Sequence, residues 1–292
     1  MRSNKTIHET HETHETHELT RTNMRIIAHL SDIHFGRVDP LLVQPLIDAV
    51  NQVKPDLVAV SGDLTQRARS HEFKQAREFL DALPKPQIVV PGNHDVPLYN
   101  VFARFLEPLN KYRRYITNDL FPFHHDDEMA VLGVNTARSL TVKGGRINEV
   151  QVEQMRERLC PLDDKLIKAI VTHHPFDLPE GHDDRDLVGR ARMAMEALAS
   201  CGADLLLAGH LHVSHTTHSA ERYKIAGHSA LVVQAGTAAS SRGRGEANSF
   251  NIIRIAAPQI TVERFEWQLA RAQFLLAAKE EFVHTEAGWK RV

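Results

Sequence analysis

Five short polar motifs, each directly after a run of apolar residues, constrain this 292-residue chain more than any other feature. In chain order they are Asp32-Ile33-His34, Gly62-Asp63, Gly92-Asn93-His94-Asp95, Thr172-His173-His174 and Gly209-His210-Leu211-His212. The apolar runs have the length of buried strands, and helical spacing follows several of them, as at 40–53 and 71–83. Strands that alternate with helices predict an α/β fold whose sheets are covered by helices. Residues just past the carboxyl ends of such strands meet along one edge, where α/β folds place their sites.

The donor atoms of these motifs predict a metal centre. Carboxylate, amide and imidazole ligands together suit Mn, Fe, Co or Zn, whereas a site of oxygen atoms alone would suit Ca or Mg. Asp63 is the candidate bridge, because a carboxylate that ends an apolar run can be shared by two ions. Two ions roughly 3.5–4 Å apart can generate a hydroxide and hold both oxygens of an in-line displacement at phosphorus. This donor set therefore predicts phosphoester hydrolysis.

The order of the motifs carries more weight than any one of them. A single Asp-x-His or Gly-Asp is a common loop or capping sequence. Glycine before a ligand has a mechanical purpose, because the backbone must turn sharply at the strand end while it passes close to an ion. Chance is a poor explanation for all five motifs in one chain, each after an apolar run.

The ordered set, from Met24 to about Arg264, resembles the calcineurin-like metallophosphoesterase superfamily. The resemblance implies a four-layer αββα sandwich, with two packed β-sheets flanked by helices. It also implies two divalent or mixed-valence ions, with Mn or Fe favoured and Zn or Co open, and a metal-bridging hydroxide as the nucleophile. The residues that match the ligands of one ion are Asp32, His34, Asp63 and His212, and those that match the ligands of the other are Asp63, Asn93, His173 and His210. The catalytic histidine of the family falls on His94, which would protonate the leaving oxygen or stabilise its charge.

Three of the motifs, read with their neighbours, are similar to those of bacterial class III cyclic-nucleotide phosphodiesterases. These are 29–32 (His-Leu-Ser-Asp), 61–65 (Ser-Gly-Asp-Leu-Thr) and 172–175 (Thr-His-His-Pro). This similarity favours 3',5'-cyclic nucleotides as substrates. A broad-specificity phosphomonoesterase, a glycerophosphodiester or phospholipid-headgroup diesterase, a nuclease and a catalytically silent binding scaffold remain open. Gln66 stands where the phosphoprotein phosphatase branch has an acid that supports its catalytic histidine, which disfavours a protein phosphatase and leaves open what orients His94.

Four further residues are candidates for substrate contacts or for support of the ligands: Arg67, Asp95, His174 and Arg242. Arg67 could reach a substrate phosphate or be an ordinary surface arginine. Only one of two adjacent histidines can face the ions, so His174 is expected to support the ligands from behind. Arg242 lies in a glycine-containing loop that could meet an anionic substrate.

Composition limits the partners and the location. The 35 basic and 37 acidic residues give a formal net charge of −2, which argues against a dedicated nucleic-acid surface. No apolar run is long enough for a membrane span. The expected partner is a small phosphodiester substrate. Assembly into a homo-oligomer remains open. The two cysteines, Cys160 and Cys201, lie outside any metal motif and are expected to be structural thiols in a reducing cytoplasm.

The chain is expected to form one metallophosphoesterase domain over 24–292, preceded by a disordered tail rich in His, Glu and Thr over 1–23. A small insertion is expected near 97–146, with a helix at 99–114. A β-meander should follow in the last third. Its strands are expected at 231–234, 250–255 and 260–265. Beyond Trp267, the apolar residues predict an amphipathic C-terminal helix.

Overall fold

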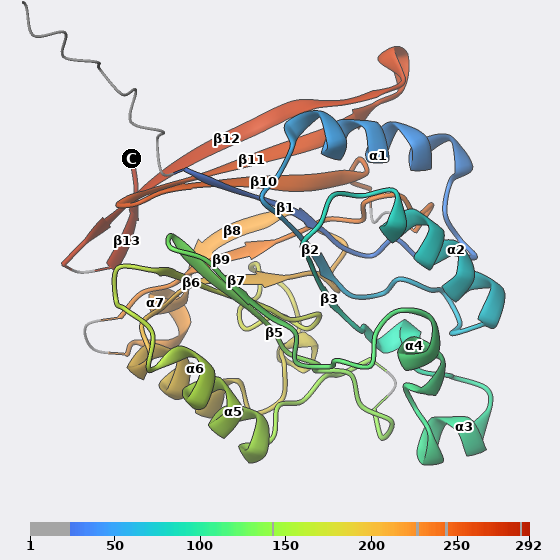
Figure 1. The fold of residues 1–292 in the computed structure, drawn as a ribbon, viewed down its shortest axis with the longest axis horizontal. Coiled ribbons are helices and arrows are strands. Elements are labelled where there is room, and N and C mark those ends of the chain that lie inside the picture. Colours follow the sequence, from blue (N-terminus) through green and yellow to red (C-terminus); the bar gives the residue numbers. More distant parts are fainter. Residues whose placement is uncertain (1–23, 142, 226–227, 243–244, 287) are drawn as a thin grey trace, which may run out of the picture.

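The computed structural model describes residues 24–141, 143–225, 228–242, 245–286 and 288–292. In this part of the chain, two β-sheets pack face to face, with helices on both outer sides (Figure 1). The four-layer αββα sandwich is therefore confirmed. The predicted tail at 1–23 lies outside the described residues.

The first sheet combines a parallel half with an antiparallel half. Among the described residues its strand order is β13-β12-β11-β10-β1-β2-β3. The strands are β1 (Arg25–Leu30), β2 (Leu57–Ser61), β3 (Gln87–Val90), β10 (Ser249–Ala256), β11 (Gln259–Gln268), β12 (Gln273–Thr285) and β13 (Gly288–Arg291). Strands β1 to β3 are parallel, and β10 to β13 form the antiparallel meander. Helices α1 (Pro40–Val53) and α2 (Ser70–Asp81) cover its outer face.

The second sheet has a parallel centre with antiparallel edges. In the described part of the chain its order is β4-β5-β6-β7-β9-β8. The strands are β4 (Phe123–His125), β5 (Met129–Gly133), β6 (Ile167–Val171), β7 (Ala203–Ala208), β8 (His215–His218) and β9 (Leu231–Gln234). Helices α5 (Glu149–Leu159) and α6 (Ala191–Ser200) cover its outer face. The short elements are α3 (Val101–Leu106), α4 (Asn110–Tyr115), α7 (Ser219–Tyr223) and the 3-10 turns η1 (Asn93–Asp95), η2 (Asp184–Asp186) and η3 (Leu269–Arg271).

Successive strand residues point to different apolar layers. On β1, Ile27 packs between the sheets, and Ala28 packs in the layer that contains Leu46 of α1. On β6, Ala169 faces the first sheet and Ile170 faces the helix side. Because both faces of each central strand are buried, these strands are predominantly apolar. The polar motifs lie just past the ends of the strands.

The sequence prediction is wrong in three elements. The strand at 231–234, expected to belong to the meander, is β9 of the second sheet, where it pairs with β7 and β8. The helix expected at 99–114 is two short helices, α3 and α4, because Pro108 between them cannot continue a helix. The helix expected after Trp267 is the strand β12, which pairs with β11 and is followed by β13. Phe274 and Phe282 are its buried residues, and they lie on opposite sides of the sheet, Phe274 in the helix layer and Phe282 between the sheets. A register shift in the pairing with β11 separates them.

The expectation of two free thiols is also wrong. Cys160 and Cys201 form a disulfide that joins the end of α5 to the end of α6. Helices α5 and α6 pack side by side on the second sheet, which brings the two residues together. The inference of a reducing cytoplasm loses this support.

The segment 97–146 contains α3 and α4, and it also contributes β4 and β5 to the second sheet. Its interpretation as an insertion stays a prediction. In the described part of the chain, no helix combines the length and apolar character needed to cross a bilayer.

The assignment of β12 predicts different effects for two residues of that strand. Phe282 is 3% exposed between the sheets, so Phe282→Ala should lower the free energy of unfolding by about 3–5 kcal/mol. Leu276 is 52% exposed, so Leu276→Ala should change it by less than ~0.5 kcal/mol. Urea unfolding measures both. Similar losses in the two variants would contradict the packing of β12.

Candidate metal centre

The five motifs lie together at one edge of the two sheets, at the carboxyl ends of parallel strands. The strand ends carry Asp32 and His34 (β1), Asp63 (β2), Asn93, His94 and Asp95 (β3), His173 and His174 (β6), and His210 and His212 (β7). Main-chain hydrogen bonds fasten the loops to one another. The N–H of Asp32 donates to Gly62 O at 3.1 Å, and the N–H of Ala238 donates to Ser31 O at 3.0 Å. The second bond joins the loop after β9 to the loop after β1, and so ties one sheet to the other.

The Asp63 carboxylate lies at the centre of the site and is 1% exposed. Its Oδ2 atom is 3.7 Å from His34 Nε2 and 3.4 Å from His173 Nε2. Its Oδ1 atom accepts a hydrogen bond from the main-chain N–H of His94 at 2.8 Å. One oxygen of Asp63 therefore lies between two groups of ligand-type atoms, while the other holds the His94 loop.

The first group consists of Asp32, His34 and His212. Asp32 Oδ1 is 3.5 Å from His34 Nε2 and 3.5 Å from His212 Nε2. The two imidazole rings are parallel, with centroids 5.1 Å apart. His212 Nδ1 is hydrogen-bonded to Thr237 Oγ1 at 2.6 Å. Among the described residues, Asp32 Oδ1 and both ring nitrogens of His34 are buried without a hydrogen-bond partner. Buried polar atoms are normally satisfied, so this group is incomplete without a ligand.

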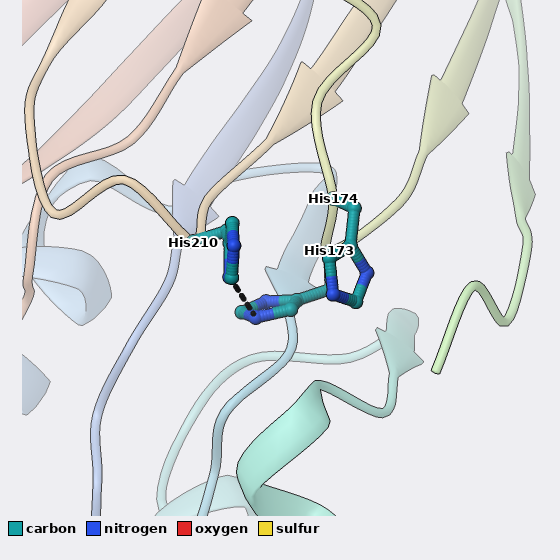
Figure 2. A group of neighbouring side chains, drawn as sticks. All are labelled: His173, His174 and His210. Carbon is teal, nitrogen blue, oxygen red and sulfur yellow. Dashed lines mark hydrogen bonds between the residues drawn. The ribbon is translucent and has the colours of Figure 1, made fainter. Parts of the chain in front are cut away.

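The second group converges on His173, which is fully buried. The ring Nδ1 of His173 donates to Ser61 O at 2.8 Å, because a carbonyl oxygen can only accept. Its Nε2 lies 3.1 Å from Asn93 Oδ1 and 3.3 Å from His210 Nδ1 (Figure 2 shows the contact with His210). His173 Nε2, Asn93 Oδ1 and His210 Nδ1 therefore lie close enough together to share one ion.

Both groups fit a divalent cation. Donor atoms that share one ion at about 2.1 Å lie about 3.0–3.4 Å from each other. The contacts above range from 3.1 Å to 3.7 Å. Burial lowers the pKa of His173, but the nearby Asp63 carboxylate raises it more, to about 9. Burial likewise raises the pKa of Asp63, while the charge of His173 lowers it well below its usual range. The site therefore favours positive charge at the position where an ion would lie.

The backbone at this edge is strained. The residues in the left-handed region are Asp32 (φ 54°), His34 (φ 55°), Asp63 (φ 52°), His210 (φ 74°) and His212 (φ 59°). This conformation is uncommon for residues other than glycine and costs on the order of 1–3 kcal/mol each. Five of the seven residues predicted as ligands are thus held in a conformation that the surrounding structure must maintain.

Two glycines of the motifs make room for carboxylates. A Cβ on Gly92 would lie 2.1 Å from Asp63 Oδ1. A Cβ on Gly209 would lie 1.8 Å from Ser31 Oγ and 2.6 Å from Asp32 Oδ2. The hydroxyl of Ser31 donates to the same Asp32 oxygen at 2.7 Å, so this close approach also orients Asp32.

His94 lies beside the two groups, and its orientation comes from the main chain. Its Nδ1 is 2.9 Å from the carbonyl oxygen of Gln66, which can only accept, so Nδ1 carries the proton. Its Nε2 is 2.9 Å from Nη1 of Arg242, which can only donate, so Nε2 accepts. Burial lowers the pKa of His94. The side chain is thus neutral in this structure.

Asp95 links the loops after β2 and β3. Its carboxylate accepts hydrogen bonds from the main-chain N–H groups of Gly92, Leu64 and Thr65 and from the Thr65 hydroxyl. Burial and the charge of Asp63 raise the pKa of Asp95 to about 6, against the effect of these donors. At 1% exposure, Asp95 holds the loops and does not face a substrate.

His174 lies beside His173 and His210 (Figure 2). Both of its nitrogens are hydrogen-bonded to other residues. Its Nδ1 accepts from the Thr136 hydroxyl at 2.8 Å, and its Nε2 donates to Lys143 O at 2.7 Å. The ring also packs 4.6 Å from the ring of His210. His174 therefore has no lone pair left for an ion.

Arg67 contacts an aromatic ring. Its guanidinium lies 5.4 Å from the centroid of the Tyr99 ring, a cation–π distance. The structure brings the other predicted site residues together and leaves Arg67 against Tyr99.

Some partners in the site were not found from the sequence. Thr237, which is hydrogen-bonded to His212, follows the strand β9. Its position past a strand end at this edge is the signal in the sequence that points to it. The carbonyl groups of Ser61 and Gln66 fix the protons of His173 and His94, and main-chain groups carry no signal in the sequence.

The family model for calcineurin-like phosphoesterases matches residues 26–214, which is more than half of the 292-residue chain. The chain belongs to this family. The family match covers all five motifs, and it confirms the resemblance inferred from them.

Curated relatives match a smaller part of the chain. The glycerophosphodiester phosphodiesterase GpdQ of Enterobacter lignolyticus is 29% identical over 172 residues, which are 55% of this chain and 60% of that protein. A probable glycerophosphodiester phosphodiesterase GpdQ of Arcobacter nitrofigilis is 29% identical over 170 residues, 56% of this chain and 59% of that protein. A probable cyclic nucleotide phosphodiesterase of Synechococcus is 33% identical over 81 residues, 24% of this chain and 31% of that protein. The chain thus matches less than two thirds of the length of each.

Solved structures with low sequence identity share the fold. A purple acid phosphatase from yellow lupin (Lupinus luteus) has a TM-score of 0.66 and 11% identity, over 89% of this chain and 54% of that one. A dimetal phosphatase from Danio rerio has a TM-score of 0.61 and 14% identity, over 86% of this chain and 98% of that one.

The close approach at Gly209 predicts a specific defect. In Gly209→Ala, the added methyl group must displace Ser31 and Asp32, so the melting temperature should fall by several degrees and Mn binding should weaken. Calorimetric unfolding and metal analysis after dialysis measure the two effects. Gly144→Ala is the control, because its Cβ would meet no atom closer than 4.0 Å. Normal Mn binding in Gly209→Ala would show that the Asp32 position is not needed.

Proposed function

We propose that this chain is a metal-dependent phosphodiesterase that acts on small phosphodiesters, with glycerophosphodiesters as the first substrate class. The observation that carries the proposal is the shared Asp63 Oδ2 atom, which faces His34 on one side and His173 on the other. Two groups of donors with one carboxylate between them are the arrangement that two adjacent ions require.

The ligands follow from the two groups. One ion would be held by Asp32, His34, Asp63 and His212, and the other by Asp63, Asn93, His173 and His210. Their oxygen and imidazole donors favour Mn or Fe, with Zn or Co as alternatives. Bound there, the ions would supply Lewis acidity and a lowered pKa for water.

The side chains of this protein contribute orientation and a proton site. The Ser61 carbonyl and the Thr237 hydroxyl orient the rings of His173 and His212 through hydrogen bonds. Histidine ligands of metal ions are usually oriented by such a hydrogen bond at the nitrogen that does not bind the ion. The Gln66 carbonyl holds the Nδ1 proton of His94, so any proton that His94 gives or takes moves at Nε2. That atom is the candidate donor to the leaving oxygen of the ester.

The substrate class rests on the relatives. The two GpdQ matches, with names that specify glycerophosphodiesters, each cover more than half of this chain. Cyclic nucleotides are the second candidate, supported by the 81-residue match and by the His-Leu-Ser-Asp and Thr-His-His-Pro motifs. A broad phosphomonoesterase and a silent scaffold are the alternatives to be tested.

Turnover by the Mn-loaded protein on a panel of esters tests the proposal. The panel comprises glycerophosphoethanolamine, 3',5'-cyclic AMP, bis(p-nitrophenyl) phosphate and p-nitrophenyl phosphate. We expect the diesters to react faster than the monoester and chelation to abolish all turnover. Faster reaction of the monoester would contradict the diesterase proposal, and absence of metal-dependent turnover on every ester would favour a scaffold.

The bridging position can be tested at Asp63. Asp63→Asn keeps the shape of the side chain but removes the negative charge that compensates two ions, so activity should collapse and metal content should fall. Metal analysis and turnover measure the change, with Asp48→Asn on the exposed face of α1 as the control. Two ions per chain and near-normal turnover in Asp63→Asn would rule out the bridge.

The proton site can be tested at His94. General acid catalysis contributes typically 10²–10⁴-fold and matters most when the leaving oxygen is basic. His94→Ala should therefore slow an alkyl or cyclic-nucleotide diester far more than a nitrophenyl diester, with both ions retained. Equal losses on the two substrates would indicate an electrostatic or positioning role, and loss of an ion would make His94 a ligand.

A further inference from the structure

Arg242 reaches the site from the loop after β9. The loop is held against the segment after β1, where the N–H of Ser241 donates to Arg37 O at 3.0 Å. The N–H of Arg242 donates to Ser240 Oγ at 3.1 Å. These bonds fix the main chain of the loop and leave the long side chain to extend toward His94.

The guanidinium makes its contacts through one nitrogen. Nη1 of Arg242 is 2.9 Å from His94 Nε2 and 3.4 Å from Gln66 Oε1. Among the described residues, Nε and Nη2 have no hydrogen bond. A guanidinium offers five N–H donors in a planar fork that suits phosphate oxygens, so most of its donors are available.

The contact at His94 Nε2 conflicts with the function of that atom. Nε2 is the nitrogen that would face the leaving oxygen, because Nδ1 is held by the Gln66 carbonyl. While Arg242 donates to Nε2, no proton can be placed there. The guanidinium must therefore leave Nε2 when an ester binds, and the acceptors that the ester itself brings are the oxygens of its phosphate.

We propose that Arg242 is a substrate-binding residue that exchanges partners, from His94 Nε2 in the free protein to a non-bridging phosphate oxygen in the complex. The exchange leaves Nε2 facing the leaving oxygen. This proposal rests on the proposed function, and it assigns to Arg242 the recognition of the phosphate charge. Arg67 instead lies against the Tyr99 ring.

Affinity for inorganic phosphate tests the proposal without requiring turnover. The Mn-loaded wild type, Arg242→Ala and Arg242→Lys are titrated with phosphate by calorimetry, and Arg271→Ala on the 3-10 turn η3 is the control. Loss of a charge-assisted hydrogen bond should weaken phosphate binding about 10-fold or more in Arg242→Ala. Arg242→Lys should recover part of the affinity, and added guanidinium chloride should restore binding to the alanine variant. Arg271→Ala should bind phosphate like the wild type.

Kinetics provide a second readout. In Arg242→Ala, KM for bis(p-nitrophenyl) phosphate should rise by the same factor as the phosphate dissociation constant. Unchanged phosphate affinity in Arg242→Ala would overturn the proposal, and so would loss of Mn, since the effect would then pass through the ions. Failure of the proposed function is a different result: the wild type would hydrolyse no ester, while the Arg242 variants could still differ in phosphate binding.

Discussion

The carboxylate of Asp63 is the constraint on which the rest of the site depends. It is buried with Asp32 in a region where uncompensated negative charge is costly. Main-chain N–H groups of His94 and His210 donate to the two carboxylates, and the imidazoles of His173 and His212 lie beside them. The Nε2 atoms of His173 and His34 lie 3.4 Å and 3.7 Å from Asp63 Oδ2. A cation bound among these atoms would compensate the buried negative charge, so metal binding would also stabilise this edge.

The arrangement of the strands could be predicted from the sequence because the signal is local. An apolar run followed within two residues by Asp63 or His173 indicates both that the strand is buried and where the strand ends. The C-terminal strand could not be predicted in this way, because a register shift puts Phe274 and Phe282 on opposite sides of the sheet and no regular alternation marks the strand. Its assignment depends on pairing with β11. Pro108, by contrast, is a local signal for the end of a helix.

The candidate site was predictable in its members but not in their orientation. Five strand ends at one edge must bring Asp32, Asp63 and His210 together, whatever the loops do. Which nitrogen of His94 is free depends on a main-chain carbonyl, and the contact of Arg242 depends on a loop that crosses from the other sheet. The Cys160–Cys201 disulfide likewise needs the neighbouring ends of α5 and α6, which are 41 residues apart in sequence.

The left-handed residues show which contacts keep the loops of the site in place. Asp32, Asp63 and His210 would relax to ordinary backbone angles if nothing opposed this. Asp95 opposes it by accepting three main-chain N–H groups and a hydroxyl from the loops after β2 and β3. The bond from Ala238 to Ser31 opposes it from the other sheet. The hydrogen bonds of the protein therefore maintain these strained angles and hold the donor atoms of the five loops toward one another.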